Sequence, residues 1–144
     1  MQSDRIVLDT NCLIAALARS SEYYPVWKGL QEKRYTLCVT NEILEEYQEI
    51  IEQKTSAVVA ENVINLLLKS ENVVLVDSYF RLQLIESDPD DNKFVDCAFA
   101  ASATYIVSDD KHFDVLKDIS FPAIRVLRLR AFLELLNRKD TSFE

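Results

Sequence analysis

The sequence predicts a three-layer α/β/α domain with a mostly parallel central sheet of four or five strands. Short apolar runs alternate with longer amphipathic segments, which is the pattern of a parallel sheet covered by helices on both faces. The 144 residues, 49% of them apolar, suit one ordinary globular domain, so we expect residues 1–144 to form a single domain. Proline occurs only at Pro25, Pro89 and Pro122, each at an expected element boundary.

The expected strands are short apolar runs, and the expected helices have apolar residues three and four positions apart. The strands cover residues 6–8, 36–39, 73–76, 105–107 and 124–126. The helices cover residues 11–19, 22–33, 41–53, 56–70, 90–102 and 129–138. Because helices separate most consecutive strands, these strands can run parallel to one another.

The rare residue types restrict the chemistry. A single glycine, Gly29, excludes the glycine-rich loops that cradle phosphates. A single histidine, His112, excludes histidine-rich zinc sites. The net charge of −8 argues against a general attraction to nucleic acid or anionic lipid, although a local cationic patch is compatible with it. Carboxylates and hydroxyls must therefore carry any chemistry.

The cysteines and the amino-terminal residues predict a cytoplasmic protein. Cys12, Cys38 and Cys97 are odd in number and far apart, which indicates buried, inert thiols in a reducing compartment. The first five residues lead directly into a short apolar run that ends at Asp9. This run does not have the features of a secretory signal. No apolar run approaches the length of a membrane-spanning helix, so we expect no membrane association.

Acidic residues follow two of the expected strands. Asp9 ends the first strand, and Asp109 and Asp110 follow the fourth strand after Ser108. Ligands of open α/β sheets bind outside the carboxyl ends of the strands, so these positions are candidates for a site. Each carboxylate has an alternative role, because an acidic residue after a strand often caps the next helix.

A second group of acidic residues lies on the helix at 41–53. Its carboxylates are Glu42, Glu45, Glu46 and Glu49, opposite an apolar face. Glu46 is favoured as a site residue because it lies at the margin of that apolar face, whereas the others suit a solvated surface.

A third group of acidic residues lies in and just before the helix expected at residues 90–102. Asp88 suits the N-cap and Pro89 the first helical position, which gives Asp88 a sufficient structural role. On the helical wheel Asp91 lies in the middle of the apolar face, and Asp96 projects away from that face. An inward-pointing Asp91 needs a cation or a hydrogen-bond donor.

Together these carboxylates indicate a metal site. Clustered carboxylates repel one another and take up protons unless a cation neutralises them. A hard divalent ion, Mg²⁺ or Mn²⁺, suits a site made of oxygen ligands. Such an ion activates water and stabilises the leaving oxygen of a phosphodiester, so nuclease activity is the leading hypothesis.

Four stretches of the chain resemble the PIN domain family, nucleases that include the VapC-like toxins of bacterial toxin–antitoxin systems. The stretches are Ile6–Ile14, Thr40–Tyr47, Asp88–Ala98 and Tyr105–Phe113, in the family's order. Residues 129–133 are similar to the final helix of one bacterial subgroup. The resemblance covers nearly the whole chain and implies a PIN-like α/β/α fold.

The resemblance also implies a site and partners. Asp9, Glu46, Asp91 and Asp110 would bind Mg²⁺ or Mn²⁺ and activate water to cut RNA. Asn11 and Ser108 are suited to orienting a ligand, and Asp96 and Asp109 are alternative ligands, as Glu42 and Glu45 are to Glu46. The family resemblance further implies a cognate antitoxin protein and a homodimer.

Two surfaces are open to more than one interpretation. The carboxyl-terminal stretch is locally basic and, with Lys93 and Lys111, suits an RNA backbone or ordinary solvated helices. Its basic residues are Arg125, Arg128, Arg130, Arg138 and Lys139. Apolar residues between 58 and 68 form either a partner groove or part of the domain's own core.

Two other functions compete with the nuclease. A receiver-like or PIN-like interaction module would use the same carboxylates only to bind a structural ion or to cap helices. A phosphatase of the haloacid dehalogenase type also places an aspartate after a strand, but it needs a second aspartate where this chain has Asn11.

Overall fold

The computed structural model describes residues 4–78, 81–86, 88–120 and 122–141, with side chains through residue 138. Five strands, β1 (Arg5–Leu8), β2 (Thr36–Val39), β3 (Val73–Leu75), β4 (Tyr105–Val107) and β5 (Val126–Leu127), form one parallel sheet. The helices are α1 (Thr10–Leu17), α2 (Tyr24–Gln31), α3 (Asn41–Lys54), α4 (Ala57–Lys69), α5 (Asn92–Ala101) and α6 (Leu129–Thr141). Two 3₁₀-helices, η1 (Pro89–Asp91) and η2 (Lys111–Asp118), lie on either side of α5 and β4 in the sequence.

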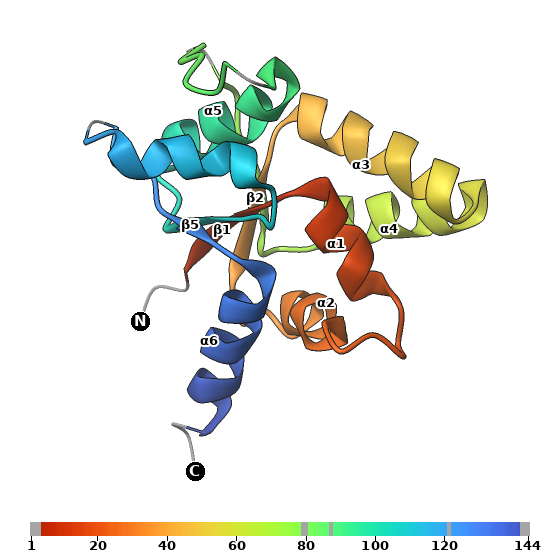
Figure 1. Ribbon diagram of the computed structural model, residues 1–144. Coiled ribbons are helices and arrows are strands. Elements are labelled where there is room, and N and C mark those ends of the chain that lie inside the picture. Colours follow the sequence, from red (N-terminus) through yellow and green to blue (C-terminus); the bar gives the residue numbers. More distant parts are fainter. Residues whose placement is uncertain (1–3, 79–80, 87, 121, 142–144) are drawn as a thin grey trace.

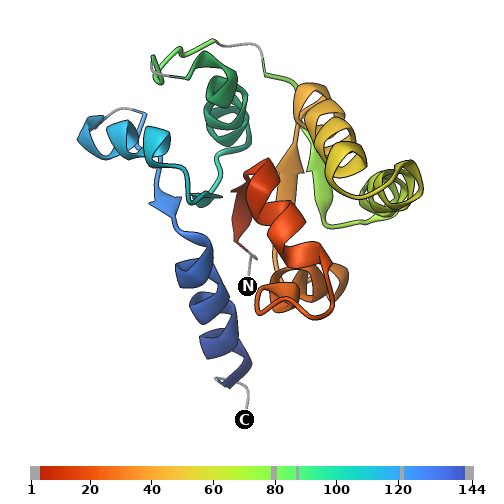
Figure 2. The same ribbon diagram turned by 45° about the vertical axis from the view of Figure 1, so that its right-hand side comes forward.

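The order of the strands places a switch point in the middle of the sheet. The order is β3-β2-β1-β4-β5, so the chain moves outward in one direction after β1 and in the other direction after β4. Right-handed crossovers then place α1 to α4 on one face of the sheet and α5 with η2 on the other. Figures 1 and 2 show these two groups on opposite sides of the strands. A crevice therefore opens at the carboxyl ends of β1 and β4.

The core lies on both faces of this sheet. The strands contribute fully buried aliphatic residues such as Ile6, Leu37 and Ile106. Tyr35 of the segment before β2 packs edge-to-face against Phe132 of α6, which attaches the last helix to the α2 side. All three cysteines are free and buried, and burial raises the pKa of the Cys12 thiol to about 12, as the expectation of inert thiols requires.

Tyr47 connects α3 to the end of β1. The side chain is fully buried, and its hydroxyl donates a hydrogen bond to the carbonyl of Leu8. Leu8 is the residue immediately before Asp9, so this bond fixes the helix that carries Glu46 against the strand that carries Asp9. The capping of α3 by Thr40, whose hydroxyl accepts from the amide of Ile43, fixes where that helix begins.

The predicted α/β/α architecture with a parallel five-stranded sheet is confirmed, but two local predictions are wrong and one helical segment was not foreseen. The last strand is β5 (Val126–Leu127) rather than residues 124–126, because β4 offers partners only opposite Val126 and Leu127. The helical segment η2 was not expected. Asp96, expected to project away from the core, is buried, because residues 81–85 cover this side of α5.

Some apolar residues of α4 belong to the domain's own core, and others are exposed, as a partner groove would require. Val63 and Leu67 are buried in the domain's own core, whereas Val58, Val59 and Leu68 are exposed. Within the described part of the chain, no helix has the length and apolar character needed to span a bilayer.

The bond between Tyr47 and Leu8 predicts a specific stability loss. Replacing Tyr47→Phe removes the hydroxyl and leaves a buried carbonyl without this donor, so the free energy of unfolding should fall by about 1–2 kcal/mol. Tyr24→Phe is the matched control, since the half-buried Tyr24 has no hydrogen bond from its hydroxyl among the described residues. Urea denaturation measures both. Equal effects of the two changes would contradict the assigned role of Tyr47.

Candidate active site

The crevice at the switch point gathers carboxylates from four segments. Asp9 follows β1, Asp110 follows β4, Asp91 lies where η1 meets α5, and Glu46 lies on α3. The amide of Asp9 donates to the carbonyl of Val107, so the ends of β1 and β4 are tied together next to the site. A hollow of about 330 Å³ borders this region, and Asp9, Asn11 and Asp110 are among the residues that line it.

Ser108 holds the two strand-end aspartates in place. Its fully buried hydroxyl donates to Asp9 Oδ2 at 2.7 Å and accepts from the amide of Asp110 at 3.0 Å. The hydrogen bond from Ser108 lowers the pKa of Asp9, but burial and the charges of Asp110 and Glu46 raise it more, and the net shift is upward. Ser108 thus contacts both strand-end aspartates.

Glu46 is the glutamate of α3 that faces the site. Its carboxylate accepts a hydrogen bond from the Thr10 hydroxyl and lies 2.9 Å from the ammonium of Lys93, which also contacts Asp90 at 2.8 Å. The Lys93 side chain is only 11% exposed. Glu42 instead forms an ion pair with Arg81 at 3.0 Å, and Glu45 is exposed.

Two of the predicted ligands, Asp91 and Asp110, form a compact cluster with Asp88 and His112. Asp88, Asp91, Asp110 and His112 each offer one ligand atom, and these atoms all lie within 4.8 Å of one another. His112 Nδ1 is 3.1 Å from Asp110 Oδ1, 3.6 Å from Asp91 Oδ2 and 3.7 Å from Asp88 Oδ2. Asp88 also caps η1, as expected, by accepting from the amide of Asp90.

The electrostatics of the cluster favour a cation. Desolvation and the charges of Asp88, Asp110 and Asp9 raise the pKa of Asp91 to about 7. Asp91 Oδ2 and His112 Nδ1 are buried atoms without a hydrogen-bond partner among the described residues. Oxygen ligands with unmet charge and an unpartnered imidazole nitrogen form a donor set that fits a divalent ion.

Asn11, Asp109 and Asp96 have other partners. Asn11 is exposed and accepts a hydrogen bond from Lys54 through Oδ1. Asp109 Oδ1 accepts from the amide of Leu129 and so caps α6. Asp96 accepts from the amide of Leu82 at 3.0 Å, and its other oxygen lies 3.8 Å from Arg81.

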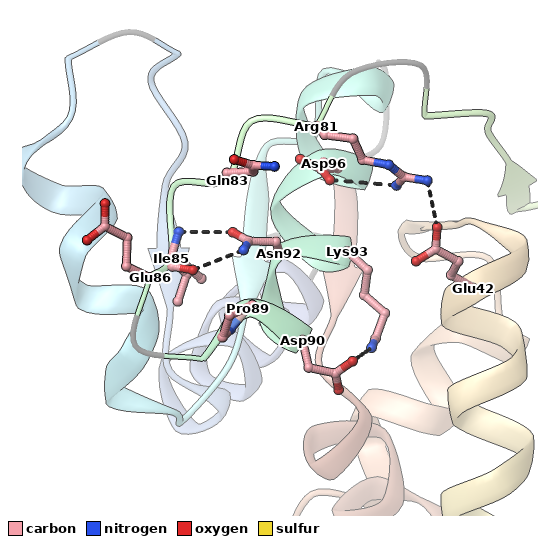
Figure 3. A pocket seen from close by; sticks show the side chains of 10 residues that line it. All are labelled: Glu42, Arg81, Gln83, Ile85, Glu86, Pro89, Asp90, Asn92, Lys93 and Asp96. Carbon is pink, nitrogen blue, oxygen red and sulfur yellow. Dashed lines mark hydrogen bonds and ion pairs between the residues drawn. The ribbon is translucent and has the colours of Figure 1, made fainter.

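A second, larger cleft adjoins the acidic centre at Lys93. It measures about 690 Å³, and Figure 3 shows Arg81 bridging Glu42 and Asp96 on one side of it and Lys93 contacting Asp90 on the other. Asn92 holds the covering segment by exchanging two hydrogen bonds with the backbone of Ile85. The charged side chains around this cleft come from α3, η1, α5 and the segment that precedes η1.

Part of the carboxyl-terminal basic surface is neutralised within the domain. Arg128 pairs with both carboxylate oxygens of Asp114, and Arg130 pairs with Glu22 at 2.8 Å and stacks near the ring of Tyr23. The side chain of Lys139 lies outside the described residues. Closer to the acidic centre, Lys93 contacts Glu46 and Asp90, and the exposed Lys111 lies between Asp110 and His112 in the sequence.

The fold and the clustered carboxylates define an α/β domain with a candidate cation site at its switch point. The chain belongs to the PIN domain family, whose model matches residues 5–112. No curated protein matches the chain.

Solved structures of toxin–antitoxin proteins have the same fold. A VapBC2 structure from Rickettsia felis, bound to promoter DNA, is 16% identical with a TM-score of 0.60 and covers 86% of this chain and 98% of that one. DNA-bound VapBC from Salmonella typhimurium is 17% identical with a TM-score of 0.56, and the match covers 90% of this chain and 99% of that one. The sarcin–ricin loop-cleaving toxin VapC20 of Mycobacterium tuberculosis is 14% identical with a TM-score of 0.54, and the match covers 83% of this chain and 98% of that one.

His112 and Asp88 are the two residues of the cluster that were not among the predicted ligands. As the single histidine of the chain, His112 argues against histidine-rich zinc sites, but it also lies two residues after Asp110. The amide of His112 donates to Asp110 Oδ1 at 2.9 Å, and this tight turn brings the imidazole back to the carboxylates. The spacing of an aspartate and a histidine two residues apart was the available signal.

The raised pKa of Asp91 predicts that metal-free protein loses stability as pH rises. The folded state keeps Asp91 protonated up to about pH 7, whereas the unfolded chain ionises it near the ordinary value of 3.8. The folded state therefore binds the extra proton, and stability falls as pH rises between these values. In EDTA at pH 8, Asp91→Asn should stabilise the protein by about 1–3 kcal/mol, and this gain should vanish below about pH 4.

Thermal and urea denaturation at pH 4, 6 and 8 measure this effect. Asp118→Asn is the control, because Asp118 is exposed and has no ion pair among the described residues. A gain from Asp91→Asn that is the same at pH 4 and at pH 8 would contradict the raised pKa.

Proposed function

We propose that this protein is a ribonuclease that depends on Mg²⁺ or Mn²⁺ and hydrolyses phosphodiester bonds of RNA. One observation carries the proposal: carboxylates of β1, β4 and the start of α5 converge at the switch point, where Asp91 keeps a buried oxygen without a hydrogen-bond partner. Mutually repelling carboxylates in a crevice need a cation, and the PIN domain family consists of nucleases.

The proposed metal ligands are Asp9, Asp91 and Asp110, with Glu46 at the rim of the site. A bound divalent ion supplies positive charge for the phosphate oxygens and acidifies water at neutral pH. Ser108 keeps Asp9 oriented by donating to one of its carboxylate oxygens. Lys93 and Thr10 keep Glu46 directed at the site through an ion pair and a hydrogen bond.

The substrate class follows from two features. The cleft of about 690 Å³ beside Lys93 offers polar walls and space next to the acidic centre. A cation at the centre reverses the local field, so an RNA phosphate can approach despite the net charge of −8. The neighbouring toxin VapC20 cleaves the sarcin–ricin loop, which is RNA.

A toxin role is the proposed biological setting. Two solved structures with this fold are VapBC complexes, and we extend from them the proposal of a cognate antitoxin protein. The homodimer implied by the resemblance, and the cytoplasmic location expected from the cysteines and the amino-terminal residues, remain part of this proposal.

The strand-end aspartates give a matched pair of variants. Asp110→Asn keeps the cap of η2 but removes a proposed ligand charge, so RNA cleavage should fall by at least about a hundredfold. Asp109→Asn keeps the cap of α6 and removes a neighbouring charge, so its activity should stay within about threefold of wild type. The assay uses a mixed pool of structured and single-stranded RNA with Mg²⁺, Mn²⁺ or EDTA.

The same pair tests the toxin role in growing bacteria. Induced wild type and Asp109→Asn should slow growth, and Asp110→Asn should not. Cleavage that persists in EDTA, or that is equal in the two variants, would overturn the metal-dependent nuclease. A folded, metal-loaded wild type that cuts no RNA would favour an interaction module.

A further inference from the structure

His112 lies inside the acidic cluster, with Nδ1 at ion-pair distance from Asp88, Asp91 and Asp110. It is the only histidine of the chain, and its backbone amide already forms the turn with Asp110. The imidazole adds no hydrogen bond to that turn, because Nδ1 is a buried atom without a hydrogen-bond partner among the described residues, although it lies 3.1 Å from Asp110 Oδ1. The ring is partly exposed at 35%, so it borders the crevice rather than the core.

The spacing of the cluster matches the ligands of a single ion. Ligand atoms about 2.1 Å from one octahedral ion lie about 3 Å apart when adjacent and about 4.2 Å apart when opposite. The distances from His112 Nδ1 to Asp110, Asp91 and Asp88 run from 3.1 to 3.7 Å, and all four ligand atoms lie within 4.8 Å. Small side-chain movements therefore suffice to bring the four atoms onto one ion.

The two unpartnered atoms point to the same ligand. Asp91 Oδ2 and His112 Nδ1 lie 3.6 Å apart, and neither is exposed or hydrogen-bonded within the described part of the chain. Buried polar atoms without a partner are rare and costly in native proteins. A divalent ion between them would satisfy both atoms at once.

We propose that His112 binds the metal ion through Nδ1, with Asp88, Asp91 and Asp110 as its carboxylate neighbours, and that this nitrogen ligand makes the site prefer Mn²⁺ to Mg²⁺. The inference rests on the proposed metal dependence but goes beyond it, because neither His112 nor Asp88 belongs to the expected ligand set. Imidazole suits transition metals, whereas Mg²⁺ prefers oxygen ligands and retains its water.

Pulsed electron paramagnetic resonance of the Mn²⁺-loaded full chain tests the nitrogen ligand without measuring activity. The protein is prepared twice, once with natural histidine and once with histidine carrying the heavy nitrogen isotope. Because the chain has a single histidine, any nitrogen signal that changes with this label comes from His112. We expect the coupling of a directly bound nitrogen, and we expect it to change with the label.

Metal titration of variants tests the preference. His112→Phe keeps the ring volume and His112→Gln keeps a polar side chain, and circular dichroism checks that each is folded. Either change should weaken Mn²⁺ binding about tenfold or more and Mg²⁺ binding by less than about threefold. Lys111→Gln, an exposed neighbour outside the cluster, should change neither affinity.

The outcomes separate this inference from the proposed function. Bound Mn²⁺ without a histidine nitrogen coupling would overturn the inference and leave the metal-dependent nuclease intact. Equal losses of Mn²⁺ and Mg²⁺ affinity in the His112 variants would overturn the stated preference. Failure of the wild type to bind either ion would overturn both the inference and the metal dependence.

Discussion

Repulsion among carboxylates at one edge of a parallel sheet is the constraint on which the rest of this structure depends. The strand order puts β1 beside β4, so Asp9 and Asp110 emerge next to each other. The first turn leading into α5 adds Asp91, whose pKa rises to about 7 because of burial and the negative charges around it. Such an arrangement costs stability when the carboxylates ionise without a cation, which is why it indicates a binding site rather than a structural element.

Ordinary packing maintains this costly arrangement. Tyr47 fixes α3 to the last residue of β1, Ser108 joins Asp9 to the backbone of Asp110, and Lys93 supplies a positive charge to Glu46. None of these contacts neutralises Asp91. The rim of the site thus has Lys93 as its cation, whereas the basic group beside Asp91 is the imidazole of His112, with Nδ1 3.6 Å from Asp91 Oδ2.

Much of the fold and of the site could be predicted from sequence because the relevant signals are periodic or lie at strand ends. The apolar runs located four of the five strands, and their ends located Asp9 and Asp110. The helical wheel separated Glu46 from Glu42 and Glu45, since burial on a regular helix follows its period. The inward position of Asp91 was predicted from the same geometry, and its side chain is 13% exposed.

The remaining features depend on contacts that periodicity does not describe. Asp96 is buried because the irregular segment 81–85 covers it, and a helical wheel contains no information about such a cover. His112 reaches the cluster through a turn of the backbone at Asp110, and β5 takes its position from the length of β4. These features arise from tertiary pairing, so one sequence alone did not reveal them.

Calorimetric titration of the metal-free protein with Mn²⁺ at pH 6 tests the central claim, that the clustered carboxylates are a cation site. At this pH Asp91 is mostly protonated, and binding of the ion must displace its proton. Repeating the titration in buffers of different ionisation enthalpy counts the protons released. The account predicts saturable binding with release of protons; the absence of saturable binding, or binding without proton release, would contradict it.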